Sequence, residues 1–285
     1  MHPSLVTRRT FLSATPILAA SASAPPATAA GRLTSRSTTD AVAEAPAQQA
    51  TTVPPRFPSQ EPAVVKEMVT VAHFDLARVE ALLTRQPALA RASWDWGFGD
   101  WESALGAASH VGNRDIAELL LAHGARPSLF SAAMLGQLEV VRAFVAAAPG
   151  IQATKGPHSL TLLAHARAGG ERAKPVVEYL ESVGGADPRL ELQPLTDAQM
   201  ARLVGTYGFG PAPDDTIDIT RNERSPGALM FTRKGGDSRG LAHVGGLAFS
   251  PAGADAVRVR FVVEGDRTTL TVHDPDVVVT GSRRF

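Results

Sequence analysis

The residues best suited to chemistry or binding form three groups, and the first is segment 94–102, Trp-Asp-Trp-Gly-Phe-Gly-Asp-Trp-Glu. It holds all three tryptophans of the chain. A tryptophan buried in an interface can contribute about 2 kcal/mol or more to binding. We therefore predict that this segment binds a partner. The alternatives are that the tryptophans pack on a neighbouring helix, or that Asp95, Asp100 and Glu102 supply a glycosidase-type carboxylate pair. The predicted partner-binding residues are Trp94, Trp96, Phe98, Trp101 and His110.

Histidines form the second group. His73 and His110 occupy equivalent positions in a repeated helical pattern, and His165 stands where that pattern normally has alanine. His158 lies seven residues before His165. Stacked imidazoles could ligate a metal ion. We favour hydrogen bonds from these side chains to backbone carbonyls of neighbouring helices, and we predict neither a metal site nor a cofactor. If His165 is buried, desolvation should lower the pKa of its imidazole.

The third group, residues 273–276 (His-Asp-Pro-Asp), has the residue types of a metal loop but the composition of a turn between strands, which we favour. Familiar catalytic motifs are missing from the sequence. No serine is followed by lysine three residues later, and there is no Gly-x-Ser-x-Gly, His-Glu-x-x-His or phosphate-binding glycine loop. The chain also has no cysteine, which excludes a thiol nucleophile, a disulfide framework and a cysteine metal site. We predict a protein that is not an enzyme.

Length and composition limit the architecture that positions these groups. A chain of 285 residues is long enough for two domains. Lys and Arg together number 28, as do Asp and Glu, which excludes nucleic-acid binding that relies on overall positive charge. Hydrophobic residues make up 44% of the chain, which excludes disorder throughout.

The N-terminal segment is predicted to be an export signal at residues 1–30. Arg8 and Arg9 precede a modest apolar stretch, and Ala27-Thr28-Ala29 fits a cleavage site after Ala29. The segment resembles a twin-arginine signal, with a Sec signal as the alternative. We expect a periplasmic or secreted protein with no membrane span in the mature chain. The segment 31–62, rich in Pro, Ser, Thr and Ala, is predicted to be a disordered linker.

Residues 63–188 follow a helical repeat pattern. In residues 103–125 a short helix and a glycine turn precede a second helix with apolar residues at i, i+3 and i+4, which ends at a glycine. The pattern recurs in three further segments: residues 68–83, 129–145 and 162–180. No such unit buries its apolar face alone, so the units must stack. The pattern resembles ankyrin repeats, most closely at Leu105–Gly112 and Gly124-Ala125. The resemblance implies a short α-solenoid of about four repeats that binds another protein.

Residues 196–285 are predicted to form an antiparallel β domain. A capping box at Thr196 and Gln199 begins one short helix, after which apolar residues alternate with polar ones. Gly265-Asp266 is predicted to be a two-residue hairpin turn. The predicted strands include Leu203–Phe209, Leu229–Arg233, Leu241–Phe249, residues 257–263, residues 268–272 and Val277–Gly281. The predicted fold class is thus α+β: an ankyrin-type solenoid followed by an antiparallel β meander or half-barrel.

Residues 202–207 (Arg-Leu-Val-Gly-Thr-Tyr) resemble the start of the small lipocalin-like β domain appended to serine-β-lactamase-like hydrolases. We predict an exported, non-catalytic interaction or scaffold protein whose solenoid binds an unidentified protein partner. One alternative is an enzyme, or a protein that binds a small ligand, with its site in the β domain. Another is an accessory module of a hydrolase.

Overall fold

The computed structural model describes residues 55–223, 225, 227–275 and 277–284. All of them belong to one compact unit, Pro54–Phe285. The predicted export signal, with Arg8, Arg9 and Ala29, lies outside the described residues, as does most of the predicted linker at 31–62. Among the described residues, no helix has both the length and the apolar character that a membrane span requires.

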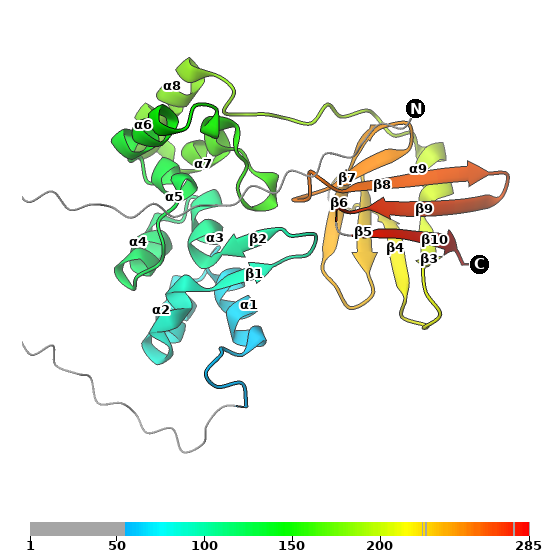
Figure 1. Ribbon diagram of the computed structural model, residues 1–285, viewed down its shortest axis with the longest axis horizontal. Helices are drawn as coiled ribbons and strands as arrows, with labels where there is room; N and C mark the ends of the chain where they lie inside the picture. The colour runs from blue at the N-terminus through cyan, green and yellow to red at the C-terminus, as the bar shows by residue number, and fades with distance from the viewer. Residues whose placement is uncertain (1–54, 224, 226, 276, 285) are drawn as a thin grey trace, which may run out of the picture. The chain divides into compact units, whose positions relative to one another are not determined.

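Short α-helices form most of the described chain up to residue 203 (Figure 1). They are α1 (Pro62–Val71), α2 (Leu76–Arg85), α3 (Ala104–His110), α4 (Arg114–Ala122), α5 (Leu129–Met134), α6 (Leu138–Ala147), α7 (Leu162–Ala168), α8 (Lys174–Val183) and α9 (Asp197–Leu203). Side-chain caps determine where several begin. The Ser103 hydroxyl accepts the Gly106 N–H at 2.9 Å, at the start of α3. The predicted capping box of Thr196 and Gln199 is confirmed at the start of α9.

The helices do not form the predicted ankyrin-type solenoid of about four repeats. In a solenoid each repeat contacts only its immediate neighbours, whereas α3 packs against α7 as well as against α1 and α5. Between α6 and α7 the chain forms a 3₁₀ turn, η3 (Pro157–Ser159), which also contacts α3. The prediction was wrong because helix spacing along the sequence does not determine which helices pack together when a connecting segment folds back across the array.

The C-terminal strands form a closed eight-stranded antiparallel barrel, in the order β10-β3-β4-β5-β6-β7-β8-β9. They are β3 (Gly205–Gly208), β4 (Thr216–Arg221), β5 (Leu229–Arg233), β6 (Ser238–Gly245), β7 (Ala248–Pro251), β8 (Arg258–Glu264), β9 (Arg267–His273) and β10 (Val278–Arg283). Because the barrel is closed, the predicted meander or half-barrel is wrong. Strand β10 pairs with β9 and also with β3, where Ser282 lies opposite Gly208. Closure leaves no unpaired sheet edge.

Two turns of the barrel lie where the sequence predicts them, and a third was not predicted. Glu264 pairs with Arg267 across the Gly265-Asp266 turn, which confirms the predicted two-residue hairpin. Residues 273–275 lie where β9 ends and the chain turns towards β10, as predicted, and Asp276 is outside the described residues. The predicted strand Leu241–Phe249 is instead two strands, β6 and β7, because Gly245 and Gly246 both adopt positive φ and reverse the chain.

A two-stranded hairpin before α3 carries much of the candidate site. Its strands are β1 (Ser93–Asp95) and β2 (Trp101–Ser103), with Trp94 opposite Glu102. Three consecutive residues of its turn have positive φ: Gly97 (102°), Phe98 (58°) and Gly99 (72°). Only glycine adopts this backbone region readily. The tight reversal leads into β2, where Glu102 lies next to His110 at the end of α3.

Candidate metal centre

Four side chains that are far apart in the sequence converge beside α3. Glu102 comes from β2 and is fully buried, and His110 is the last residue of α3. His73 lies in the turn that follows α1, and His158 lies in η3 with a positive φ of 58°. The α3–α7 packing explains this convergence, because it lays η3 against α3 and β2.

The four side chains present nitrogen and oxygen atoms to a common point. Nε2 of His110 lies 3.0 Å from Nε2 of His73 and 3.0 Å from Oε1 of Glu102. Nε2 of His158 lies 3.3 Å from the same oxygen. One such atom from each residue can be chosen so that all four lie within 4.8 Å of one another. Four ligands about 2.0–2.1 Å from a tetrahedral zinc ion are separated by roughly 3.3 Å, so the set has the dimensions of a metal site.

Hydrogen bonds on the outer sides of two imidazoles orient them. Nδ1 of His73 lies 2.9 Å from the carbonyl oxygen of Thr70, and Nδ1 of His158 lies 2.8 Å from Oδ2 of Asp100. Because carbonyl and carboxylate oxygens only accept, both Nδ1 atoms must carry the proton. A neutral ring in this tautomer has its lone pair on Nε2, which faces the cluster. Metal-ligating histidines are held in this way in known sites.

The carboxylates are oriented in turn. Asp100 also accepts the backbone N–H of His158 at 2.8 Å and Nη1 of Arg239 at 3.0 Å, and both Asp100 and Arg239 are buried. Nε1 of Trp96 donates to Oε2 of Glu102 at 2.8 Å. Oε1 of Glu102 makes no contact of hydrogen-bond geometry among the described residues, although two imidazole nitrogens lie near it. This oxygen is therefore aimed into the cluster.

The protein environment shifts the acidity of the cluster strongly. Burial raises the pKa of Glu102, but the close approach of the imidazole nitrogens of His110 and His158 and the charge interactions with the imidazoles outweigh burial and lower it to about 2. The hydrogen bond to Asp100, followed by the close contact with Glu102, raises the pKa of His158 to about 9. The pKa of Asp100 is also lowered, because its contacts with His158 outweigh burial. In the metal-free protein Glu102 and its neighbour Asp100 are therefore ionised, and His158 is an imidazolium.

His165 lies beside the cluster without belonging to it. It is fully buried, and its Nδ1 donates to the carbonyl oxygen of Thr161 at 2.9 Å. Burial lowers the pKa of His165, as predicted. Its ring packs against Phe130, with centroids 4.8 Å apart. The predicted bond to a backbone carbonyl is present, but the carbonyl belongs to Thr161, the N-cap of the helix that carries His165, and not to a neighbouring helix. His73 likewise contacts the carbonyl of Thr70, in the last turn of the helix that precedes it.

The predicted partner-binding residues do not share one environment. Trp94 and Trp96 are partly buried against the core formed by α1–α4, whereas Phe98 packs against the core of the barrel. Trp101 is 64% exposed. His110 is a member of the four-residue cluster. Sequence analysis placed His73 near His110 and named His158 in the same group of histidines, but gave no reason to add Glu102.

No family model, curated protein or solved structure matches the chain. The site is therefore interpreted from its geometry.

Proposed function

We propose that the protein binds one divalent transition-metal ion, of which zinc fits the donors best. The ligands would be Nε2 of His73, His110 and His158 together with Oε1 of Glu102. The convergence of these four donors, with outer hydrogen bonds that leave lone pairs facing inward, carries the proposal. Imidazole and carboxylate are normal zinc ligands, and outer partners of this type are typical of zinc sites.

A structural rather than catalytic role is supported by the number of donors. Catalytic zinc usually has three protein ligands and an open position for water, whereas structural zinc has four protein ligands. Here four protein donors are available. An ion held by them would add a further link between α1, β2, α3 and η3, which already pack together. We infer a non-catalytic binding protein whose helical part is organised by the metal.

The test is metal binding by the full chain. After dialysis against a chelator, the wild-type protein is expected to take up one Zn²⁺ per chain, measured by mass spectrometry of the metal content. Co²⁺ in its place is expected to give the intense visible absorption of four-coordinate cobalt. His110→Ala and Glu102→Gln should each weaken zinc affinity by at least the roughly 10–100-fold that loss of an outer partner alone produces.

His123→Ala is the matched control, because His123 is exposed and lies outside the cluster. It should bind zinc like the wild type. Zinc present at 100 times its dissociation constant should raise the free energy of unfolding by about 2.7 kcal/mol in the wild type and the control. Equal zinc affinity in the wild type and in His110→Ala would contradict the proposal.

A further inference from the structure

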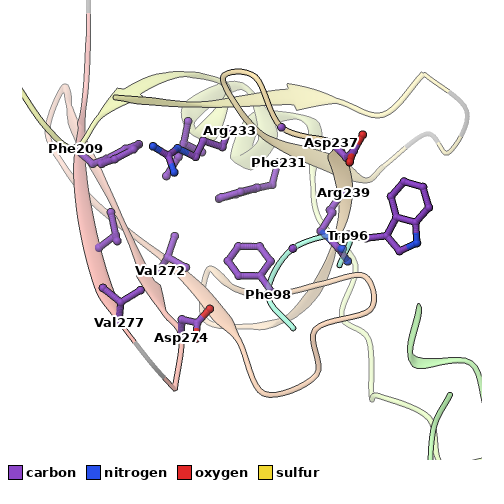
Figure 2. A pocket seen from close by; sticks show the side chains of 14 residues that line it. Trp96, Phe98, Phe209, Phe231, Arg233, Asp237, Arg239, Val272, Asp274 and Val277 are labelled. Carbon is purple, nitrogen blue, oxygen red and sulfur yellow. The ribbon is translucent and has the colours of Figure 1, made fainter. Parts of the chain in front are cut away.

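A second site lies where the hairpin turn meets one end of the barrel. A cavity of about 340 Å³ lies between Trp96, Gly97 and Phe98 on one side and strands of the barrel on the other (Figure 2). This volume is at the lower end of the range for small-molecule sites. The barrel interior itself is filled by buried side chains such as Tyr207, Phe249 and Phe261. The cavity therefore lies at one end of the barrel, where the core residues Ile217, Phe231 and Val272 form part of its wall.

Apolar side chains form most of the cavity wall. They are Phe98, Phe209, Ile217, Phe231, Val272 and Val279. In Figure 2 the rings of Phe98 and Phe231 lie next to each other at the centre of the view, and their centroids are 5.6 Å apart. Aromatic pairs at this spacing accept a further ring at their faces or edges. The wall thus suits an apolar body of one or two rings.

Phe98 has a strained backbone conformation. Its φ of 58° is unusual for a residue with a side chain, and the glycines on either side also have positive φ. Such a conformation is strained and persists only where surrounding contacts enforce it, as in ligand clamps. Here the ring of Phe231 packs on Phe98, and the backbone N–H groups of Trp96 and Asp100 donate to the carbonyl oxygens of Asp100 and Gly97, which closes the turn.

The charges around the cavity favour an anion. Among the described residues, no carboxylate lies within ion-pair distance of the Arg233 guanidinium. The guanidinium makes a cation–π contact with Phe209, with Cζ 5.3 Å from the ring centroid. Two other charged side chains that line the cavity already form ion pairs. Arg239 binds Asp100 at 3.0 Å, and Asp237 binds Lys66 at 3.1 Å. The remaining acid of the wall, Asp274, lies in the turn that follows β9, across the cavity from Arg233 (Figure 2).

We propose that this cavity binds a small amphipathic carboxylate, with an aromatic or aliphatic body against Phe98 and Phe231 and its carboxylate on Arg233. A guanidinium can form two parallel hydrogen bonds with a carboxylate, which fixes the orientation of the ligand. The site goes beyond the proposed metal centre and does not depend on it, since none of the four metal donors lines the cavity.

The test compares three probes that share one apolar body: 4-phenylbutyrate, 4-phenylbutanol and 4-phenylbutylammonium. Binding to the full chain is measured by calorimetry and by tryptophan fluorescence, because Trp96 lines the cavity. The carboxylate is expected to bind at least tenfold more tightly than the alcohol, and the ammonium compound more weakly than either. Equal binding of the three probes, or preference for the cation, would overturn the proposal.

Variants separate the head group from the body. Arg233→Gln should remove the preference for the carboxylate and leave alcohol binding unchanged, and Arg260→Gln is the matched control because Arg260 is an exposed arginine on β8. Phe98→Leu should weaken all three probes together. Each measurement is repeated with Zn²⁺ and with chelator, so failure of the metal proposal would be seen separately. Carboxylate preference that survives Arg233→Gln would refute the assignment of the head-group site.

Discussion

The buried ion pair between Asp100 and Arg239 offers the sharpest test of how the hairpin is held. Asp100 is 5% exposed and Arg239 is 8% exposed, so water can hardly reach either side chain to replace a lost partner. Removing one partner of such a pair leaves an uncompensated buried group and costs about 3–5 kcal/mol. We expect Arg239→Met to fall near 3 kcal/mol, because Asp100 keeps two donors from His158.

Asp100→Asn is expected to cost more, about 4–5 kcal/mol. It removes the charge that faces both Arg239 and His158, and among the described residues it leaves the guanidinium with the carbonyl oxygen of Ala252 as its remaining acceptor. Because the two side chains share one interaction, the double variant should be less destabilised than the sum of the single variants, by roughly 1–3 kcal/mol.

The assay is urea unfolding of the full chain at pH 7 with chelator present, so that metal binding does not contribute. Arg142→Met is the matched control, since Arg142 pairs with Glu139 on the surface, where the two side chains are 51% and 82% exposed. Exposed pairs contribute about 0–1 kcal/mol. If Arg239→Met costs no more than Arg142→Met, the reasoning that burial makes this pair important is wrong.

Two further outcomes follow from close packing and from burial. Gly169→Ala should destabilise the protein strongly, because a Cβ there would lie inside van der Waals contact of the Met134 carbonyl oxygen although φ is negative. Thermal unfolding should show a smaller loss for Gly124→Ala, where φ is positive but the space is open, and the opposite order would refute the steric argument. For Tyr207, burial raises the pKa from 10.0 to about 12, so the neutral phenol stabilises the fold below pH 10 and that contribution is lost between pH 10 and 12. Tyr207→Phe should lose about 1 kcal/mol at pH 7 with its hydrogen bond to Leu203. Its free energy of unfolding should then fall less steeply than that of the wild type above pH 10, and parallel pH profiles would count against the shift.

The candidate site was only partly accessible to sequence reasoning. The helical pattern put His73 and His110 at equivalent positions, and the two imidazoles do meet, with Nε2 atoms 3.0 Å apart. Glu102 was noticed only as one acid in a tryptophan-rich loop. His158 lies 56 residues beyond Glu102 in the sequence, in a short 3₁₀ turn that carries no periodic pattern. Nothing local relates these two residues, so their contact could not be predicted.

Short-range physical chemistry was sufficient for the features that depend on a few neighbouring residues. A capping box needs only Thr196 and Gln199, a tight turn needs only Gly265 and Asp266, and a half-buried strand needs only alternation. Closure of the barrel depends on β10 reaching β3, about 75 residues away in the sequence, and neither strand carries a local signal for that pairing. The same holds for the packing of α3 against α7, which overturned the predicted solenoid and assembled the four metal donors. The tertiary structure determines both of these long-range contacts, because only burial of the whole core selects among the pairings that the local patterns allow.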